Sequence, residues 1–152
     1  NLAITYENLG RLDEALRLKR DVYSGCLKLN GEENDRTLLA ANNYASSLAE
    51  LKRFEEAKTL LRKTMPVARR VVGGSHELAL SMSALYTKAL YTDEGATLDD
   101  VREAVTTLEE TERTARRVMG GAHPLTVDIE DELRDARAAL RARETPPPAK
   151  SA

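Results

Sequence analysis

The sequence has very few aromatic and sulfur-containing residues. Among its 152 residues there is no Trp, one Phe, one Cys and two His. The single Cys has no partner in the chain, so an internal disulfide framework is excluded. With charged residues at 32% and aromatic residues at 4%, the composition indicates long amphipathic helices.

Long apolar runs and a dominant charge are also absent. No uninterrupted apolar run approaches the roughly 20 residues that a membrane-spanning helix needs. Lys and Arg number 23 against 25 Asp and Glu, so the formal net charge is −2. This balance gives no general attraction for nucleic acid or for an acidic membrane surface. The chain begins at Asn1 inside a helical pattern and shows no targeting signal, so we expect a fragment or processed chain of a cytoplasmic protein.

What the sequence does contain is an internal repeat. The segment 10–15, GRLDEA, returns 42 positions later as KRFEEA at 52–57. A second segment, RRVVGGSHEL at 69–78, returns 47 positions later as RRVMGGAHPL at 116–125. The last copy is therefore longer, and the sequence allows two placements of the added residues. Either two lie in the turn around 93–96 and three in the following helix, or all five lie in the turn.

The hydrophobic pattern is helical in every unit. In the second unit, Ala57, Leu60, Leu61, Thr64 and Met65 follow the i, i+3, i+4, i+7 spacing of one helix face. No segment alternates as a strand does, so the sequence predicts an all-α chain. We expect helix pairs over 1–34, 35–76 and 77–123, a capping helix over 124–144 and a disordered Pro-rich tail over 145–152.

Helix ends are marked by particular residues. Gly10 is expected to end the first helix, and Gly31, Gly73 and Gly120 are expected to end the second helix of each pair, because a residue with positive φ is favoured there. Thr97 with Asp100 forms the sequence of a capping box, which predicts a helix start at that point.

The repeat resembles a known family. Asn1-Leu2-Ala3 with Tyr6, followed by the turn at 10–15, resembles a tetratricopeptide repeat, and the Gly-Gly-x-His-x-Leu linkers at 73–78 and 120–125 resemble its kinesin light chain subtype. The resemblance implies an α-solenoid in which the first helix of each pair, helix A, lines a concave groove. It also implies a non-catalytic scaffold that binds a protein or peptide partner.

Other sites find little support in the sequence. His76 and His123 occupy the same linker slot, so they are expected to be structural helix-start residues rather than metal ligands, since no ligand cluster accompanies them. Cys26 lies on an apolar stripe, which favours a buried thiol over a nucleophile. The two Gly-Gly pairs follow helices rather than strands, so they do not form phosphate loops. We therefore expect no catalytic residue, metal, cofactor or small-molecule substrate.

The repeated arginine pairs leave two interpretations open. In the first, Arg69-Arg70 and Arg116-Arg117 form a basic stripe for phosphates or an acidic partner. The helix dipole alone also favours basic residues in a last turn, and no aromatic side chains are interleaved for stacking on bases. We favour the dipole interpretation and expect no nucleic-acid partner.

The groove is the expected binding site. Positions of helix A without a core role should face it: Asn1, Ile4 and Asn8; Leu39, Asn42, Asn43, Ser46 and Glu50; Ser81, Ala84, Leu85, Lys88 and Tyr91. The resemblance implies that asparagines at the Asn1 and Asn43 slots hold an extended peptide. The alternative is that both asparagines tie neighbouring helices together. We expect the polar side chains of Asn42, Asn43 and Ser46 to hold the backbone of the bound peptide. Lys88 and Glu50 should select the charge of its side chains. Apolar contact should come from Leu39, Leu85 and Tyr91. A permanent structural subunit, or an accessory segment of a longer enzyme, are the alternatives.

Overall fold

The computed structural model describes residues 2–145, except for the side chains of residues 2–4, 6 and 7. Within that range the chain forms helices and no strand: α1 (Leu2–Asn30), α2 (Asp35–Glu50), α3 (Phe54–Val72), α4 (Glu77–Thr92), α5 (Leu98–Met119) and α6 (Pro124–Glu144). The prediction of an all-α chain is confirmed. The predicted tail lies outside the described residues except for Thr145, whose N–H donates to the Arg141 carbonyl.

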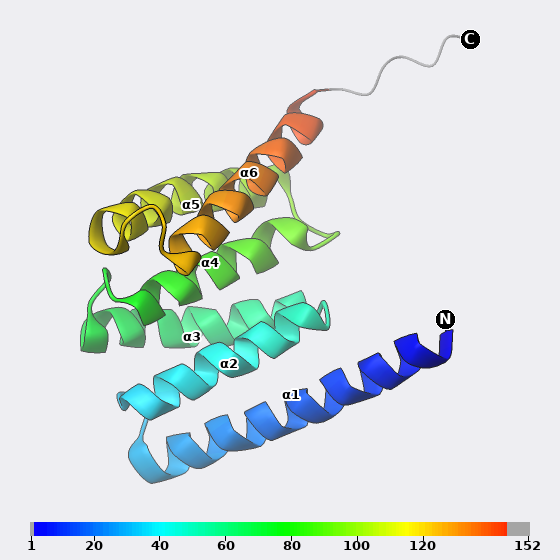
Figure 1. The fold of residues 1–152 in the computed structure, drawn as a ribbon, viewed down its shortest axis with the longest axis vertical. Coiled ribbons are helices and arrows are strands. Elements are labelled where there is room, and N and C mark those ends of the chain that lie inside the picture. The colour runs from blue at the N-terminus through cyan, green and yellow to red at the C-terminus, as the bar shows by residue number, and fades with distance from the viewer. Residues whose placement is uncertain (1, 146–152) are drawn as a thin grey trace.

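The helices form a two-layered stack (Figure 1). Each helix packs against the next in the chain, and α2 also contacts α4, which in turn contacts α6. Helices α2, α4 and α6 therefore form one row, while α3 and α5 cover its other side. A stack of this kind is needed because a single pair of amphipathic helices cannot bury its own apolar stripe.

The helix starts are capped by side chains. Asn34 accepts a hydrogen bond from the Arg36 N–H, and Thr97 and Asp100 form a complete capping box at the start of α5. The helix ends at Gly31, Gly73 and Gly120 have φ of 81°, 91° and 87°, which is a backbone conformation that favours glycine. The capping box and these three glycine ends were predicted correctly.

The helix lengths decide where the extra residues of the last copy lie. Helices α2 and α4 are both 16 residues long, whereas α3 has 19 residues and α5 has 22. The turn between α2 and α3 covers 51–53, and the turn between α4 and α5 covers 93–97. Three residues were therefore added within the helix and two in the turn. Three residues are close to one helical turn, so the apolar face of α5 continues with a modest rotation.

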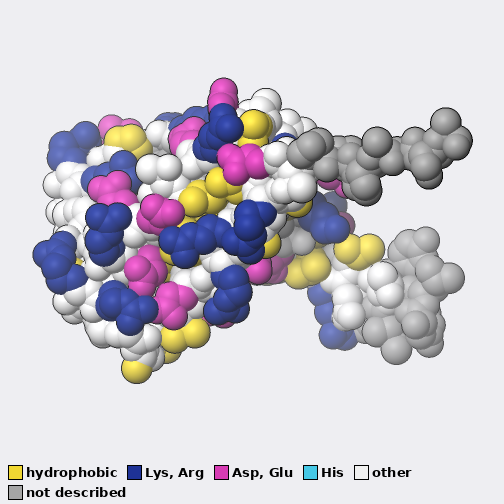
Figure 2. Space-filling view, turned by 90° about the horizontal axis from the view of Figure 1, so that it is seen from above, with side chains coloured by type: hydrophobic (Ala, Val, Ile, Leu, Met, Phe, Trp, Pro, Cys, Tyr) yellow, Lys and Arg dark blue, Asp and Glu magenta, His cyan; other side chains and the backbone are white. Residues whose placement is uncertain are grey.

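The core is built from leucine and alanine. Leu48, Leu61 and Leu108 are almost completely buried, and Ala45 and Ala57 have no exposed surface. Alanine at such contacts lets neighbouring helix backbones approach closely, while leucine fills the space between units. At the α6 end of the stack, Lys and Arg alternate with Asp and Glu over the outer face (Figure 2). This charged surface is what a terminal capping helix requires.

The first unit differs from the prediction. Gly10 does not end a helix, because α1 continues through it and spans 29 residues (Figure 1). A continuous helix keeps the i→i−4 backbone hydrogen bonds that a turn would lose, and glycine in a helix interior costs only about 1 kcal/mol. The expected helix pair over 1–34 is therefore a single long helix, and its first turns extend beyond the end of α2.

Candidate groove between alternate helices

A hollow lies on the side of the stack where α2, α4 and α6 meet. Its volume is about 170 Å³, and its floor is formed by apolar side chains of α4 and α6, among them Leu85 and Leu125. Polar and charged groups from all three helices surround this floor. The full lining is Asn42, Ser46, Ser81, Ala84, Leu85, Lys88, Leu125, Asp128 and Glu132.

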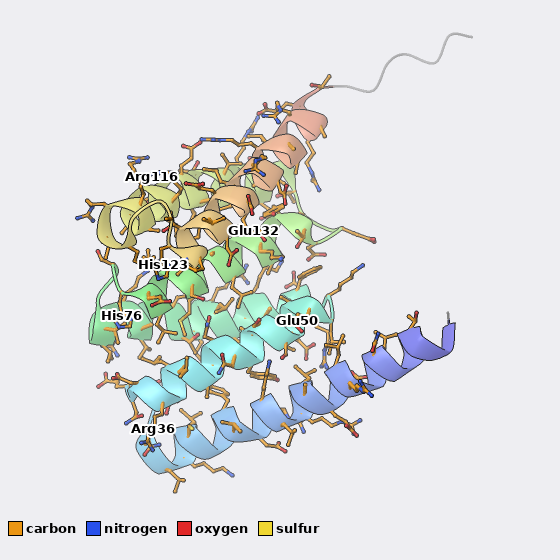
Figure 3. The ribbon with its side chains drawn as sticks, in the orientation of Figure 1. Arg36, Glu50, His76, Arg116, His123 and Glu132 are labelled. Carbon is orange, nitrogen blue, oxygen red and sulfur yellow. The ribbon has the colours of Figure 1, made fainter. Side chains whose placement is uncertain are left out.

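A second, larger hollow of about 720 Å³ adjoins the first through Lys88, which lines both. It lies where the turns after α2 and α4 come together, and Phe54 supplies its aromatic surface. Figure 3 shows Glu50 at the end of α2 and Glu132 on α6, on the same side of the stack. We refer to the two neighbouring hollows together as the concave groove.

Asn42 joins two helices across this groove. Its Nδ2 donates a hydrogen bond to Ser81 Oγ at 3.3 Å, so α2 and α4 are tied together at this point. Its Oδ1 is buried and has no hydrogen-bond partner among the described residues. A buried carbonyl oxygen without a donor is unfavourable, because it has lost its hydration without compensation. Because it is buried, this oxygen reaches a molecule in the groove only after the side chain turns outward.

Glu132 organises the other wall. One of its carboxylate oxygens lies 3.1 Å from Lys88 Nζ, and the other accepts a hydrogen bond from the Tyr91 hydroxyl. Burial raises the pKa of Tyr91 above its ordinary value, and the hydrogen bond to Glu132 raises it further. Two contacts from α4 thus hold the carboxylate of α6 in place at the groove edge.

The predicted groove residues fall into distinct positions. Asn42, Ser46, Ser81, Ala84, Leu85 and Lys88 line the smaller hollow, and Glu50 lines the larger one. Leu39 and Asn43 are exposed on α2 but do not line either hollow, and Asn8 is exposed on α1. Asn1 lies outside the described residues, as does the side chain of Ile4.

Tyr91 does not reach the groove surface. Only 8% of the residue is exposed, and the ring belongs to the core cluster with Leu133 of α6. The prediction treated it as a groove residue because it was taken as a position of helix A without a core role. Its position is explained by the packing of α6, which covers this end of α4.

The sequence interpretation missed the contribution of α6. This helix was assigned to capping alone, yet Leu125, Asp128 and Glu132 line the smaller hollow. The 47-residue offset carried the signal, because it places Asp128 in the slot of Ser81 and Glu132 in the slot of Leu85. Helix α6 is therefore the helix A of a further unit as well as the cap.

The histidines are helix caps, as predicted. The His76 ring Nδ1 accepts a hydrogen bond from the Leu78 N–H at 3.1 Å, and His123 Nδ1 accepts one from the Leu125 N–H at 3.2 Å. Figure 3 shows both at the starts of their helices. Residues 2–145, as far as they are described, contain no cluster of three or more potential metal ligands. Cys26 is half-buried rather than fully enclosed.

The repeated arginines take part in local ion pairs. Arg70 lies 2.7 Å from Glu33, and the Arg116 Nε lies 2.8 Å from Glu112 while its Nη2 contacts Glu130. One arginine of each repeated pair is thus neutralised by an acidic partner. All four arginines lie in the last turn of α3 or α5, where the helix dipole favours basic residues without a phosphate ligand.

Comparisons with known proteins agree with this architecture. Residues 1–70 match the family model described as "Tetratricopeptide repeat". The crystal structure of BtubC (BKLC) from P. vanneervenii is similar, with a TM-score of 0.63 and 19% sequence identity, over 99% of this chain and 66% of that chain. This chain thus spans just under two thirds of the length of that protein. No curated protein sequence matches. None of the described helices is both long and apolar enough to cross a membrane.

Proposed function

This chain is a tetratricopeptide repeat protein with a kinesin light chain-like fold, and we propose that it binds an extended segment of a partner protein in the concave groove. Tetratricopeptide repeats generally mediate protein–protein interaction, and such helical repeats are typically non-catalytic. The observation that supports this site most directly is the apolar floor of Leu85 and Leu125, surrounded by polar and charged groups of α2, α4 and α6.

We assign Asn42 the role of acceptor for the backbone of the bound segment, after its side chain turns the buried oxygen outward. Every peptide unit except one before proline carries an N–H donor, so an amide oxygen recognises a main chain whatever its side chains are. Turning the oxygen outward gives up the hydrogen bond from Nδ2 to Ser81, which the new hydrogen bond replaces. Ser46, on the same face of α2, supplies a second polar group beside it.

The apolar floor accommodates a side chain of the bound segment. Leu85 and Leu125 are half-buried, and Ala84 leaves room between them. Leu39, which is 52% exposed on α2, offers further apolar surface to a segment that extends past the hollow. Asn43, exposed on the same helix, is placed to contact such a segment.

The charge of the groove favours a basic segment. The linings of the two hollows contain five acidic side chains, Glu50, Asp93, Glu94, Asp128 and Glu132, and two basic ones, Lys52 and Lys88. Lys88 is already paired with Glu132, and Asp93 is paired with Lys58. Glu50, Glu94 and Asp128 then stand against Lys52 alone. A segment with Lys or Arg next to an apolar residue is therefore complementary to this groove.

The test is selection of peptides from an unbiased displayed library, followed by fluorescence polarisation. We expect the selected sequences to combine an apolar residue with Lys or Arg, and their affinity to fall as salt is added. Asn42→Ala should weaken binding about tenfold, which corresponds to one hydrogen bond. Thr106→Ala, at an exposed position of α5, is the matched control and should bind as the wild type does.

Two outcomes contradict the proposal. Selected peptides whose binding is unchanged by Asn42→Ala would place the binding surface elsewhere. A library that yields no binder, together with permanent association of the chain into a larger assembly, would favour a structural subunit instead.

A further inference from the structure

A polar hollow lies on the side of the stack that α3 and α5 cover, away from the concave groove (Figure 1). Its volume is about 430 Å³, and it occupies the gap between α3 and α5, which do not pack against each other. A volume of this size is in the range of small-molecule sites. Its polar lining includes Arg69 of α3, Ser83 of α4 and four residues of α5, namely Thr107, Glu110, Thr111 and Thr114.

The internal repeat shows that two of these threonines stand where the preceding unit has apolar residues. Over 104–115, each buried position of α5 corresponds to a buried position of α3 at the 47-residue offset. At the same offset, Thr107 corresponds to Leu60 and Thr114 to Val67. Leu60 and Val67 both pack against a core cluster of α2, α3 and α4. The later unit thus gives up apolar packing for a hydroxyl-lined space, and such a departure from the repeat pattern is typical of functional positions.

The hydroxyl groups of this hollow have their protons committed to other atoms. Thr111 Oγ1 donates to the Thr107 carbonyl at 2.7 Å, and Thr114 Oγ1 donates to the Glu110 carbonyl at 3.0 Å. Because the proton of Thr111 is used in this way, the 3.1 Å hydrogen bond between Ser83 and Thr111 has Ser83 as its donor. The remaining lone pairs of these oxygens are acceptors. Together with the Glu110 carboxylate they suit a group that donates hydrogen bonds, such as an ammonium.

The hollow also carries one charge of each sign, on different helices. Arg69 lies in the last turn of α3, and Glu110 lies on α5. Neither side chain forms an ion pair or a side-chain hydrogen bond with another described side chain, whereas the neighbouring Arg70 is paired with Glu33. A ligand with both a cation and an anion therefore matches this pair of groups better than a ligand with a single charge.

We propose that this hollow binds a free α-amino acid. The carboxylate of the ligand accepts hydrogen bonds from the Arg69 guanidinium, whose planar donors match its geometry. The ammonium donates to the Glu110 carboxylate and to the hydroxyl oxygen of Thr114. Buried Leu80 in the lining gives apolar surface to the carbon atoms of the ligand. The site is separate from the concave groove, so this inference does not depend on what the groove binds.

The test is to titrate each of the common L-amino acids, at millimolar concentrations, into the full chain. Thermal unfolding identifies the binders, and calorimetry then measures their affinities. We expect at least one amino acid to raise the melting temperature in a saturable way. Its C-terminal amide and its N-acetyl derivative should bind about tenfold more weakly or worse, because each lacks one of the two charges.

The chain supplies its own residues for closing the hollow. Thr107→Leu combined with Thr114→Val introduces the residues of the preceding unit at the same slots, so the double variant should fold and lose amino-acid binding. Arg69→Gln leaves the hollow open. It should weaken binding of the free amino acid about tenfold but leave binding of its amide unchanged. Thr106→Ala, at an exposed position of α5 outside the hollow, should bind as the wild type does.

Three results overturn the proposal. The first is that no amino acid changes the melting temperature or gives a binding heat with the wild type. The second is equal binding by the wild type and by the folded double variant, which would place the site elsewhere. The third is an amide that binds the wild type as tightly as the free amino acid does, since Arg69 would then hold no carboxylate.

Discussion

Lys88 of α4 lies 3.1 Å from Glu132 of α6, and the same carboxylate accepts the hydrogen bond of the Tyr91 hydroxyl. The Lys88 side chain is 49% exposed, so the ion pair itself adds at most about 1 kcal/mol to stability. Its importance is positional, because it fixes an acidic group at the wall of the concave groove. The buried member of this group is Tyr91, whose hydrogen bond to Glu132 can be tested by mutation.

Tyr91→Phe should lower the free energy of unfolding by about 1 kcal/mol at neutral pH, since it removes one hydrogen bond. Burial, and then Glu132, raise the pKa of Tyr91 in the folded state. The contribution of this group is therefore complete below the ordinary tyrosine pKa of about 10 and is lost as pH rises through the higher folded value. Urea unfolding of both proteins at increasing pH should show the wild-type advantage shrinking. An advantage that stays constant into strong alkali would contradict this account.

Thr97→Ala should destabilise the protein by about 1 kcal/mol, because it opens the capping box of α5. Thr106→Ala, on the same helix but outside the cap, should have little effect. The hydrogen bond from the Thr97 backbone lowers the pKa of Asp100. The stabilising contribution of the Asp100 carboxylate is present above the ordinary aspartate pKa. It is lost as pH falls through the lower pKa that Asp100 has in the folded state. Asp100→Asn should therefore make the free energy of unfolding fall less steeply as pH is lowered. Equal effects of Thr97→Ala and Thr106→Ala on stability would rule out the capping role.

Lys58→Ala should destabilise the chain by about 1–2 kcal/mol, whereas Lys58→Met should be close to the wild type. The Lys58 side chain is only 7% exposed and lies 2.5 Å from Glu55 and 3.4 Å from Asp93. Burial alone would lower its pKa, but hydrogen bonds and charge from Glu55 and Asp93 raise it overall. The corresponding residue of α1 is Leu16, also buried, so the site accepts an apolar side chain. Thermal unfolding that ranks Lys58→Met below Lys58→Ala would disprove this.

His123→Ala should cost about 1 kcal/mol of stability, and His123→Asn should restore most of it, because asparagine is a preferred N-cap. Neither zinc nor a chelator should change the melting temperature of the wild type, since the ring nitrogen serves a backbone N–H. A zinc-dependent rise in melting temperature that His123→Asn abolishes would instead indicate a metal site.

Much of the fold was predictable from the repeat. The two Gly-Gly-x-His linkers located the starts of α4 and α6, because both glycine and histidine have a defined task at a helix boundary. Helices α3 and α5 each bury one apolar face, and this face appears in the sequence as the helical spacing of apolar residues. The spacing therefore predicted both helices. The sequence alone did not decide how the added residues divide between turn and helix, because both alignments preserve the hydrophobic pattern. The helix bounds of the structure decided it.

The remaining differences arise from contacts between distant segments. Asp93 stands where the two earlier copies of the repeat have Leu9 and Leu51. Its role as the partner of Lys58, 35 positions away, is visible only in the structure. Tyr91 was placed in the groove because its neighbours on helix A face that way, but α6 buries it. At Gly10 the turn signal of the repeat predicted a helix end, but α1 continues through this residue.

The most direct test of the account is amide NMR of the ¹⁵N-labelled chain during titration with a library-selected basic peptide. The account predicts shifts concentrated on α2, α4 and α6, with the Asn42 side-chain amide among the largest, and their loss in Asn42→Ala. Shifts confined to α3 and α5, and preserved in Asn42→Ala, would show that the partner binds the opposite side of the stack.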